Sequence, residues 1–266
     1  MNDELPSSVE GDQPVRTAPW MGFLAALQFL TVLPPFVRRP FTARELGASL
    51  GWFPFVGLLI GLALVLFDAL LALAFPLPLR SALLLSLWVL LSGALHLDGF
   101  LDACDGLFGG WTPEKRLEIL RDERVGAYAL AGGVLLLLVK FSALLALPSH
   151  WEALMLAPVL GRWGLTLGVV AFPYARPDGL GRSMKDHAGW REIVLASVIS
   201  TAVAWCVGRW MGFVTLGIAL LVIWGVARFT LKRIPGLTGD IYGAINEMVE
   251  LVVLLSWVTI QNLAPG

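Results

Sequence analysis

The sequence predicts an all-α integral membrane protein, a polytopic helical bundle of about seven transmembrane helices preceded by a short apolar helix. Three observations favour this class. Hydrophobic residues make up 57% of the 266 residues and charged residues only 15%, whereas soluble domains carry about a quarter charged residues. The mean hydropathy is +0.77. Eleven tryptophans agree with a chain that lies in and around a bilayer, because Trp concentrates at membrane interfaces.

The N-terminal part contains a polar tail and a short apolar segment. Residues 1–19 lack a positively charged start followed by an apolar run, so they predict a flexible tail and no secretory signal peptide. Residues 20–33 are apolar but short, and Pro34 and Pro35 end them. We expect a helix that lies in the membrane interface or tilts within it. No repeat or linker divides the rest, so residues 20–266 are expected to form one membrane-embedded catalytic domain.

Seven further segments are long and apolar enough to cross a membrane, which takes about 20 residues. The first is long enough to require a tilt or a bend, for which Pro54 is the candidate position. Pro148, Pro173 and Pro235 each fall where a helix should end. The expected spans are residues 46–75, 81–101, 127–147, 152–172, 192–208, 212–228 and 248–263.

The distribution of basic residues supports this count. If the seven spans alternate in direction, one side of the membrane receives only Arg80 and Arg209. The positive-inside rule then assigns the other side to the cytoplasm. Fourteen of the nineteen basic residues fall on that side: Arg38, Arg39, Arg44, Lys115, Arg116, Arg121, Arg124, Arg176, Arg182, Lys185, Arg191, Arg228, Lys232 and Arg233.

Residues 93–126 form the most unusual stretch of the chain, with seven of its twenty acidic residues. Asp98, Asp102 and Asp105 are spaced four and then three apart, which places them on one face of a helix. Three like charges on one face require a counter-charge, and a divalent cation such as Mg²⁺ takes carboxylate and phosphate oxygens. The alternative is a solvated helix end whose acids pair with the basic residues that follow.

Two other polar stretches fall on the same side. Residues 236–250 carry Asp240, Glu247 and Glu250 on one helical face, although acids there could simply favour the start of the last helix. Residues 173–187 place Arg176 and other cations among glycines, as a loop that grips phosphate would. The alternative for that loop is an ordinary set of cytoplasmic positive charges.

Lys140 and Arg162 lie inside predicted spans. A charge at such a position costs on the order of 3 kcal/mol on insertion scales, so Arg162 is expected to have a partner in the bundle. That partner is either a substrate phosphate or a buried carboxylate such as Asp68. Lys140 could also reach the interface by extending its side chain.

The composition narrows the chemistry further. Cys104 and Cys206 have no CxxC spacing, so neither a disulfide framework nor a zinc site is expected. The net charge of −1 gives no reason to expect a nucleic-acid partner.

The assembled residues indicate transfer of a phosphoryl or prenyl group. The acids would bind metal, the cations would bind a diphosphate, and the bilayer would hold a large partner.

Four motifs in order resemble the cobalamin synthase family, the adenosylcobinamide-GDP ribazoletransferases of late vitamin B12 biosynthesis. The motifs are LHLDGFLDACDGLFGG, EKRLEILRDERVG, YARPDGLG and GLTGDIYGAINEMVEL, and the resemblance extends from about residue 22 to residue 255. Phe100, Leu101 and Glu123 depart from the family pattern. The resemblance implies a transferase that joins adenosylcobinamide-GDP to α-ribazole, or to its 5′-phosphate, and releases GMP with the help of Mg²⁺.

The resemblance also implies roles for individual residues. Removal of a proton from the attacking ribazole hydroxyl is expected of His96 or Glu247. The expected metal ligands are Asp98, Asp102, Asp105 and Asp240. The residues expected to bind substrate or phosphate are Arg116, Arg121, Arg124, Lys140, Arg162, Arg176, Thr238 and Glu250.

Other functions stay open at this point. A CDP-alcohol phosphotransferase or a UbiA-type prenyltransferase would use similar acids, but residues 236–250 lack the second Asp-rich motif of either class. A cation transporter would place its charges near the middle of the bilayer. We expect an active site facing the cytoplasm in the bacterial inner membrane, and the sequence leaves open whether the chain forms a homo-oligomer.

Overall fold

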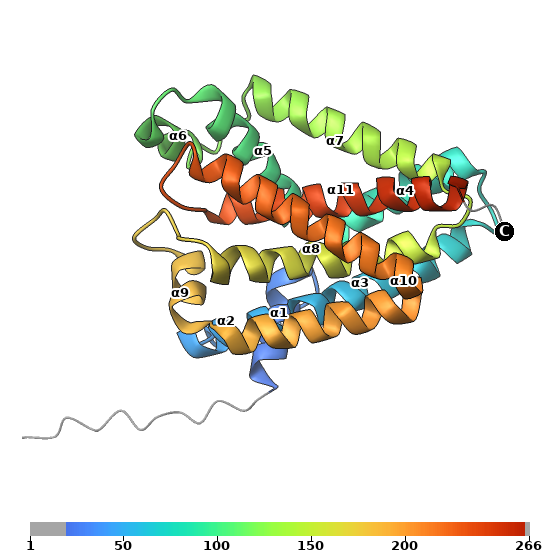
Figure 1. Cartoon of the computed structure of the whole chain (residues 1–266), viewed down its shortest axis with the longest axis horizontal. Helices are drawn as coiled ribbons and strands as arrows, with labels where there is room; N and C mark the ends of the chain where they lie inside the picture. The colour runs from blue at the N-terminus through green and yellow to red at the C-terminus, as the bar shows by residue number, and fades with distance from the viewer. Residues whose placement is uncertain (1–19, 264–266) are drawn as a thin grey trace, which may run out of the picture.

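The computed structural model describes residues 20–263 as a bundle of helices (Figure 1). The predicted tail, residues 1–19, lies outside the described residues. The described part contains no β-strand, only an isolated bridge between Tyr174 and Leu237. The elements are α1 (Met21–Leu30), α2 (Ala43–Ser49), the 3₁₀ turn η1 (Leu50–Trp52), α3 (Phe53–Leu71), α4 (Leu77–Leu91), α5 (Leu95–Gly109), α6 (Pro113–Ile119), α7 (Ala127–Ala146), α8 (Trp151–Ala171), α9 (Leu180–His187), α10 (Trp190–Leu231) and α11 (Gly239–Leu263).

The short apolar helix is confirmed as α1, whose ten residues run across the long helices rather than along them (Figure 1). The first span begins at α2, where Thr42 and Glu45 form a capping box and Arg39 pairs with Glu45 at 2.6 Å. From there α2, η1 and α3 run on for 29 residues. The 3₁₀ turn η1 lies just before Pro54, the candidate position for a bend, and Pro54 itself lies in the first turn of α3, where proline is tolerated.

The second span differs from the continuous helix that the sequence predicts over residues 81–101. It is broken into α4 and α5, which meet at 88°. Gly93 and Ala94 adopt φ angles of 59° and 58°, in the left-handed region that ends a helix. The chain therefore turns before the acidic motif, and α5 presents its carboxylates on a separate short helix.

The fifth and sixth spans form one continuous element, α10, with a break at Arg209 (φ 50°, ψ −133°). Residues eight apart in a straight helix are about 12 Å apart, yet a Cβ on Gly212 would collide with the carbonyl group of Ala204. The helix therefore folds back on itself, as Figure 1 shows. Five described helices are long and apolar enough to span a membrane, or six with the bent α4–α5 pair. Counting the two halves of α10 separately gives the seven predicted crossings.

Helix α8 occupies the centre of the bundle and packs on α3, α10 and α11. Small residues allow these helices to approach closely, as is common in membrane bundles. A Cβ at Gly57 of α3 would lie 2.8 Å from the carbonyl carbon of Pro158, and one at Gly161 would lie 2.6 Å from the side chain of Asn246. The sequence of α8 thus fixes the position of α11, which carries the second acidic motif.

The two ends of the bundle differ in charge. At one end α6, α9 and the loop before α11 gather (Figure 1), and Arg116 reaches the backbone carbonyl of Arg233 at 3.4 Å. At the other end Gln261 and Ser149 exchange two hydrogen bonds of 3.0 Å. The predicted basic loops therefore share one end, and Arg80 and Arg209 lie at the opposite end.

Candidate active site

The acidic helix α5 lies directly against the start of α11. A Cβ on Gly99 would lie 3.0 Å from the carbonyl oxygen of Asp240, and a Cβ on Gly243 would lie 2.9 Å from that of His96. Larger residues at these glycines would force the helices apart. The two glycines therefore bring Asp98 and Asp240, which are far apart in the sequence, to one site.

Asp240 is held by two groups, one from the loop after α8 and one from the loop before α11. The Arg176 guanidinium donates to its carboxylate at 2.7 Å, and the Thr238 hydroxyl donates at 3.1 Å. Arg176 also donates to the carbonyl oxygen of Leu120 at 3.0 Å. The structure thus brings together Arg176, Thr238 and Asp240, as the sequence predicts for a phosphate site.

The loop that carries Arg176 is fixed by backbone pairing. Ala175 and Leu237 form a 2.8 Å hydrogen bond, and so do Leu237 and Pro173. Tyr174 stacks on Tyr242 with ring centroids 6.1 Å apart. Burial raises the pKa of Tyr174, and the nearby Arg176 and Arg121 oppose that rise. The phenol is therefore neutral at physiological pH.

Asp105 has a structural role that the spacing of the acids does not reveal. Its carboxylate accepts hydrogen bonds from the backbone amides of Gly126 at 2.6 Å and Ala129 at 2.9 Å. These amides belong to the exposed start of α7, where a carboxylate stabilises the helix. Asp105 is thus engaged by the protein, whereas Asp98 and Asp102 have no side-chain hydrogen bond among the described residues.

The acids do not form a preassembled metal cage. Among residues 20–263, no three His, Cys, Asp or Glu side chains are placed to hold a metal ion together. Mg²⁺ in phosphoryl-transfer enzymes is usually held by one or two carboxylates together with substrate phosphates. The donors Asp98, Asp102 and Asp240 fit that kind of site, in which the substrate supplies the remaining oxygens.

The other predicted phosphate-binding cations lie around the same end. Arg116 is half-buried and its Nε has no hydrogen-bond partner among the described residues. Arg124 is exposed and pairs with Asp122 at 2.8 Å, which lowers the pKa of Asp122 to about 2. Arg121 is exposed beside Tyr174. Among the described residues, Arg116 and Arg121 have no carboxylate partner, whereas Arg124 already has one.

Lys140, Arg162, Glu247 and Glu250 form a buried network. Lys140 contacts Glu247 at 2.5 Å and Glu250 at 2.7 Å, and Arg162 pairs with the other oxygen of Glu250. The amide of Asn246 also donates to Glu250, at 3.1 Å. Two cations and two carboxylates balance one another, which is how buried charges are tolerated in membranes.

The network revises two expectations. Arg162 does have a carboxylate partner, but Asp68 is the wrong one. Asp68 instead pairs with Arg80 and with His150 at the opposite end of the bundle. Because Arg162 and Glu250 are each 1% exposed, neither side chain is accessible to a substrate phosphate in this arrangement.

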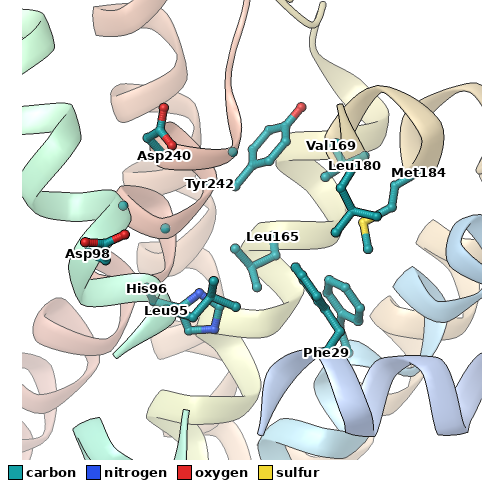
Figure 2. A pocket seen from close by; sticks show the side chains of 15 residues that line it. Phe29, Leu95, His96, Asp98, Leu165, Val169, Leu180, Met184, Asp240 and Tyr242 are labelled. Carbon is teal, nitrogen blue, oxygen red and sulfur yellow. The ribbon is translucent and has the colours of Figure 1, made fainter. Parts of the chain in front are cut away.

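A cavity of about 250 Å³ opens beside the two acids. Figure 2 shows Asp98 and Asp240 on one side and Phe29, Val169 and Met184 on the other. The remaining lining residues are Phe53, Leu95, His96, Gly99, Leu165, Leu180, Gly181, Gly239, Tyr242 and Gly243.

The apolar wall was not predicted. Phe29, Leu165 and Met184 come from three different helices, so no local motif marks them. Tyr242 lies inside the last acidic motif, and this position was the one sequence signal that could have indicated that it lines the cavity. Of the two candidate bases, His96 lines the cavity, whereas Glu247 lies in the buried network.

Comparison with known proteins identifies the family. Residues 22–258 match the family model described as cobalamin-5-phosphate synthase. An adenosylcobinamide-GDP ribazoletransferase of Pseudomonas savastanoi pv. phaseolicola is 42% identical over 246 residues, which cover 88% of this chain and 97% of that protein. Those of Pseudomonas putida and Pseudomonas entomophila are each 44% identical over 88% of this chain and 96% of theirs. No solved structure matches the chain. The chain therefore belongs to the cobalamin-5-phosphate synthase family.

Proposed function

We propose that this protein is the adenosylcobinamide-GDP ribazoletransferase of late cobalamin biosynthesis. It joins adenosylcobinamide-GDP to α-ribazole, or to its 5′-phosphate, and releases GMP. The observation that carries the proposal is the meeting of Asp98 from α5 with Asp240 and Arg176 at the edge of an apolar cavity. Acids and a guanidinium suit a diphosphate with its metal, and the cavity suits an apolar part of a substrate.

Mg²⁺ is the proposed cofactor, as one or two ions, each held by one or two of the carboxylates of Asp98, Asp102 and Asp240 together with the diphosphate. Asp105 is omitted from this set because two backbone amides already occupy its carboxylate. When bound, the metal neutralises charge on the diphosphate oxygens and orients them. The carboxylate of Asp240 is prepared for this role by Arg176 and Thr238, which fix its orientation.

The reaction is a substitution at the phosphorus that carries cobinamide. A ribose hydroxyl of α-ribazole forms the new P–O bond, the bond to GMP breaks, and the hydroxyl proton is released. We assign Arg176, Arg116 and Arg121 to neutralise the negative charge that develops on the leaving GMP. Positioning and charge neutralisation supply most of the catalysis in such transfers.

The buried network acts indirectly in this proposal. Lys140 and Glu250 connect α7 with α11, and Arg162 connects α8 with α11. The network therefore holds the helix that carries Asp240. The expected direct contact of these residues with phosphate is replaced by a role in positioning.

The proposed location is the bacterial inner membrane, with the basic end of the bundle in the cytoplasm. The support is the concentration of basic residues at the end where α6 and α9 lie and the positive-inside rule. The nucleotide substrate is then bound from the cytoplasm.

The test is a reconstituted reaction. Purified protein in detergent receives adenosylcobinamide-GDP, α-ribazole and Mg²⁺, and GMP release is measured together with the corrinoid product. We expect release that requires both α-ribazole and Mg²⁺. Release that is independent of α-ribazole would indicate a hydrolase and would contradict the proposal.

A further inference from the structure

The cavity beside Asp98 is mostly apolar away from its acidic edge. Its walls are formed by aromatic and aliphatic side chains from α1, α3, α8 and α9, among them Phe29, Leu165 and Met184. The hydroxyl group of Tyr242 points away from His96 in Figure 2. The polar side chains that line the cavity are His96, Asp98, Asp240 and Tyr242. The two acids lie at its edge, so His96 is the polar side chain that faces the apolar walls.

His96 lines the cavity and has a buried ring nitrogen without a partner among the described residues. Its side chain is 3% exposed, and its Nε2 atom has no hydrogen-bond partner among the described residues. A neutral imidazole carries one N–H donor and one acceptor nitrogen. Leaving such a group buried without a partner is unfavourable, so a ligand that supplies one complementary atom would be selected.

The size of the cavity limits what enters it. Sites for drug-sized ligands occupy about 300–1,000 Å³, so a cavity of about 250 Å³ holds a single small ring system. The corrin ring of adenosylcobinamide is much larger than that. The candidates are therefore the two smaller rings of the substrates, guanine and the 5,6-dimethylbenzimidazole of α-ribazole.

The chemistry of the walls favours dimethylbenzimidazole. Guanine presents several donors and acceptors along its edges, and apolar walls would leave most of them unpaired. Dimethylbenzimidazole is apolar apart from one free ring nitrogen, which is an acceptor. One unpaired acceptor on the ring thus matches one unpartnered imidazole in the cavity.

We propose, on the basis of the proposed function, that this cavity binds the dimethylbenzimidazole ring of α-ribazole and that His96 determines specificity by donating a hydrogen bond to the free ring nitrogen. The ribose then lies toward Asp98 and Asp240, where its hydroxyl meets the diphosphate. His96 recognises the base and does not remove the proton of the attacking hydroxyl.

The test measures discrimination between two nucleosides. The first is α-ribazole and the second is its indole counterpart, in which C–H replaces the free ring nitrogen. We expect the wild type to prefer α-ribazole about tenfold to a hundredfold in kcat/KM, the range set by one buried donor that loses its acceptor. His96→Phe should bring that ratio close to one, and His187→Gln on the exposed face of α9 should leave it unchanged.

The discrimination ratio separates this role from the others. A general base would lower turnover of both nucleosides equally, and so would a structural defect. An unchanged ratio in active His96→Phe protein therefore overturns the proposal.

A second variant covers the case in which His96→Phe does not fold. Val169→Phe narrows the cavity and should raise the KM for α-ribazole about tenfold or more, the loss expected when a buried apolar ring is displaced, without changing that for adenosylcobinamide-GDP. If only the KM for adenosylcobinamide-GDP rises, guanine occupies the cavity. That result would overturn this inference and leave the proposed function standing. Absence of any ribazole-dependent GMP release by the wild type would overturn the proposed function as well.

Discussion

At the scale of single residues, the acids of α5 separate into different roles. Asp98 lines the cavity, Asp102 has no side-chain hydrogen bond within residues 20–263, and Asp105 binds the amides at the start of α7. Their shared position on one helical face does not distinguish them. Substitutions at neighbouring acids should therefore have different effects.

Asp102→Asn should abolish most activity and leave the fold intact. The change keeps the size of the side chain and removes the charge that a hard cation requires. We expect GMP release to fall by orders of magnitude at ordinary Mg²⁺ concentrations, with an unchanged melting temperature. Near-normal release would show that Asp102 is not a metal ligand.

The matched variant Asp105→Ala should instead lower stability. It removes the acceptor for the amides of Gly126 and Ala129, and the loss of such a cap typically costs about 1 kcal/mol. The melting temperature in detergent is the measurement. If the melting temperature is unchanged and GMP release no longer depends on Mg²⁺, Asp105 is a metal ligand.

Arg162→Met should destabilise the protein because, of the charged partners that the structure describes for Glu250, it leaves only Lys140. Breaking a buried ion pair from one side costs about 3–5 kcal/mol. The yield of folded protein should fall, and Glu250→Gln in the same chain should restore much of it. A stable, inactive single variant would point to direct phosphate binding by Arg162.

At the scale of secondary-structure elements, the contact between α5 and α11 positions the site. That contact depends on two glycines, because a Cβ at Gly243 would lie 2.9 Å from the carbonyl oxygen of His96 and 3.1 Å from the Cα of Gly99. The separation of Asp98 and Asp240 is therefore set by backbone packing.

Gly243→Ala should lower both activity and melting temperature, because the added methyl group pushes the two helices apart. Gly217→Ala in α10 is the control, since a Cβ there meets nothing within 4 Å and alanine favours a helix by up to about 1 kcal/mol. We expect that variant to be fully active and at least as stable as the wild type. Equal behaviour of the two variants would argue against close packing as the determinant.

At the scale of the whole molecule, the bundle has a basic end that holds the site and an opposite end that holds the Asp68, Arg80 and His150 cluster. The His150 imidazole also contacts the carbonyl oxygen of Leu144 at 2.8 Å, so this cluster connects α3, α4, α7 and α8. The two ends should face opposite sides of the membrane.

Cysteine labelling in whole cells should place residues 115, 182 and 233 on the cytoplasmic side and residue 149 on the other side. Single cysteines are introduced into a Cys206→Ser background, because Cys206 is exposed and Cys104 is buried. A membrane-impermeant reagent should label only the cysteine at position 149. Labelling of positions 115 and 149 from the same side would contradict the arrangement of spans.

The sequence by itself determined the class, most of the spans and the family. Apolar runs of membrane length identify spanning helices because a bilayer leaves few alternatives for the backbone, and four ordered motifs identify the family. The sequence also named Asp240 and Arg176 as site residues from their residue type and Thr238 from the family resemblance, and the structure places the three side chains in contact.

Only the tertiary structure decided which residues share a contact. The left-handed Gly93 and Ala94 break the second span, and the carboxylate partner of Arg162 is Glu250 rather than Asp68. Asp105, a predicted metal ligand, accepts the amides at the start of α7, and the apolar cavity combines α1, α8 and α9. Each of these outcomes depends on packing between helices distant in the sequence, which the periodicity of a single segment does not encode.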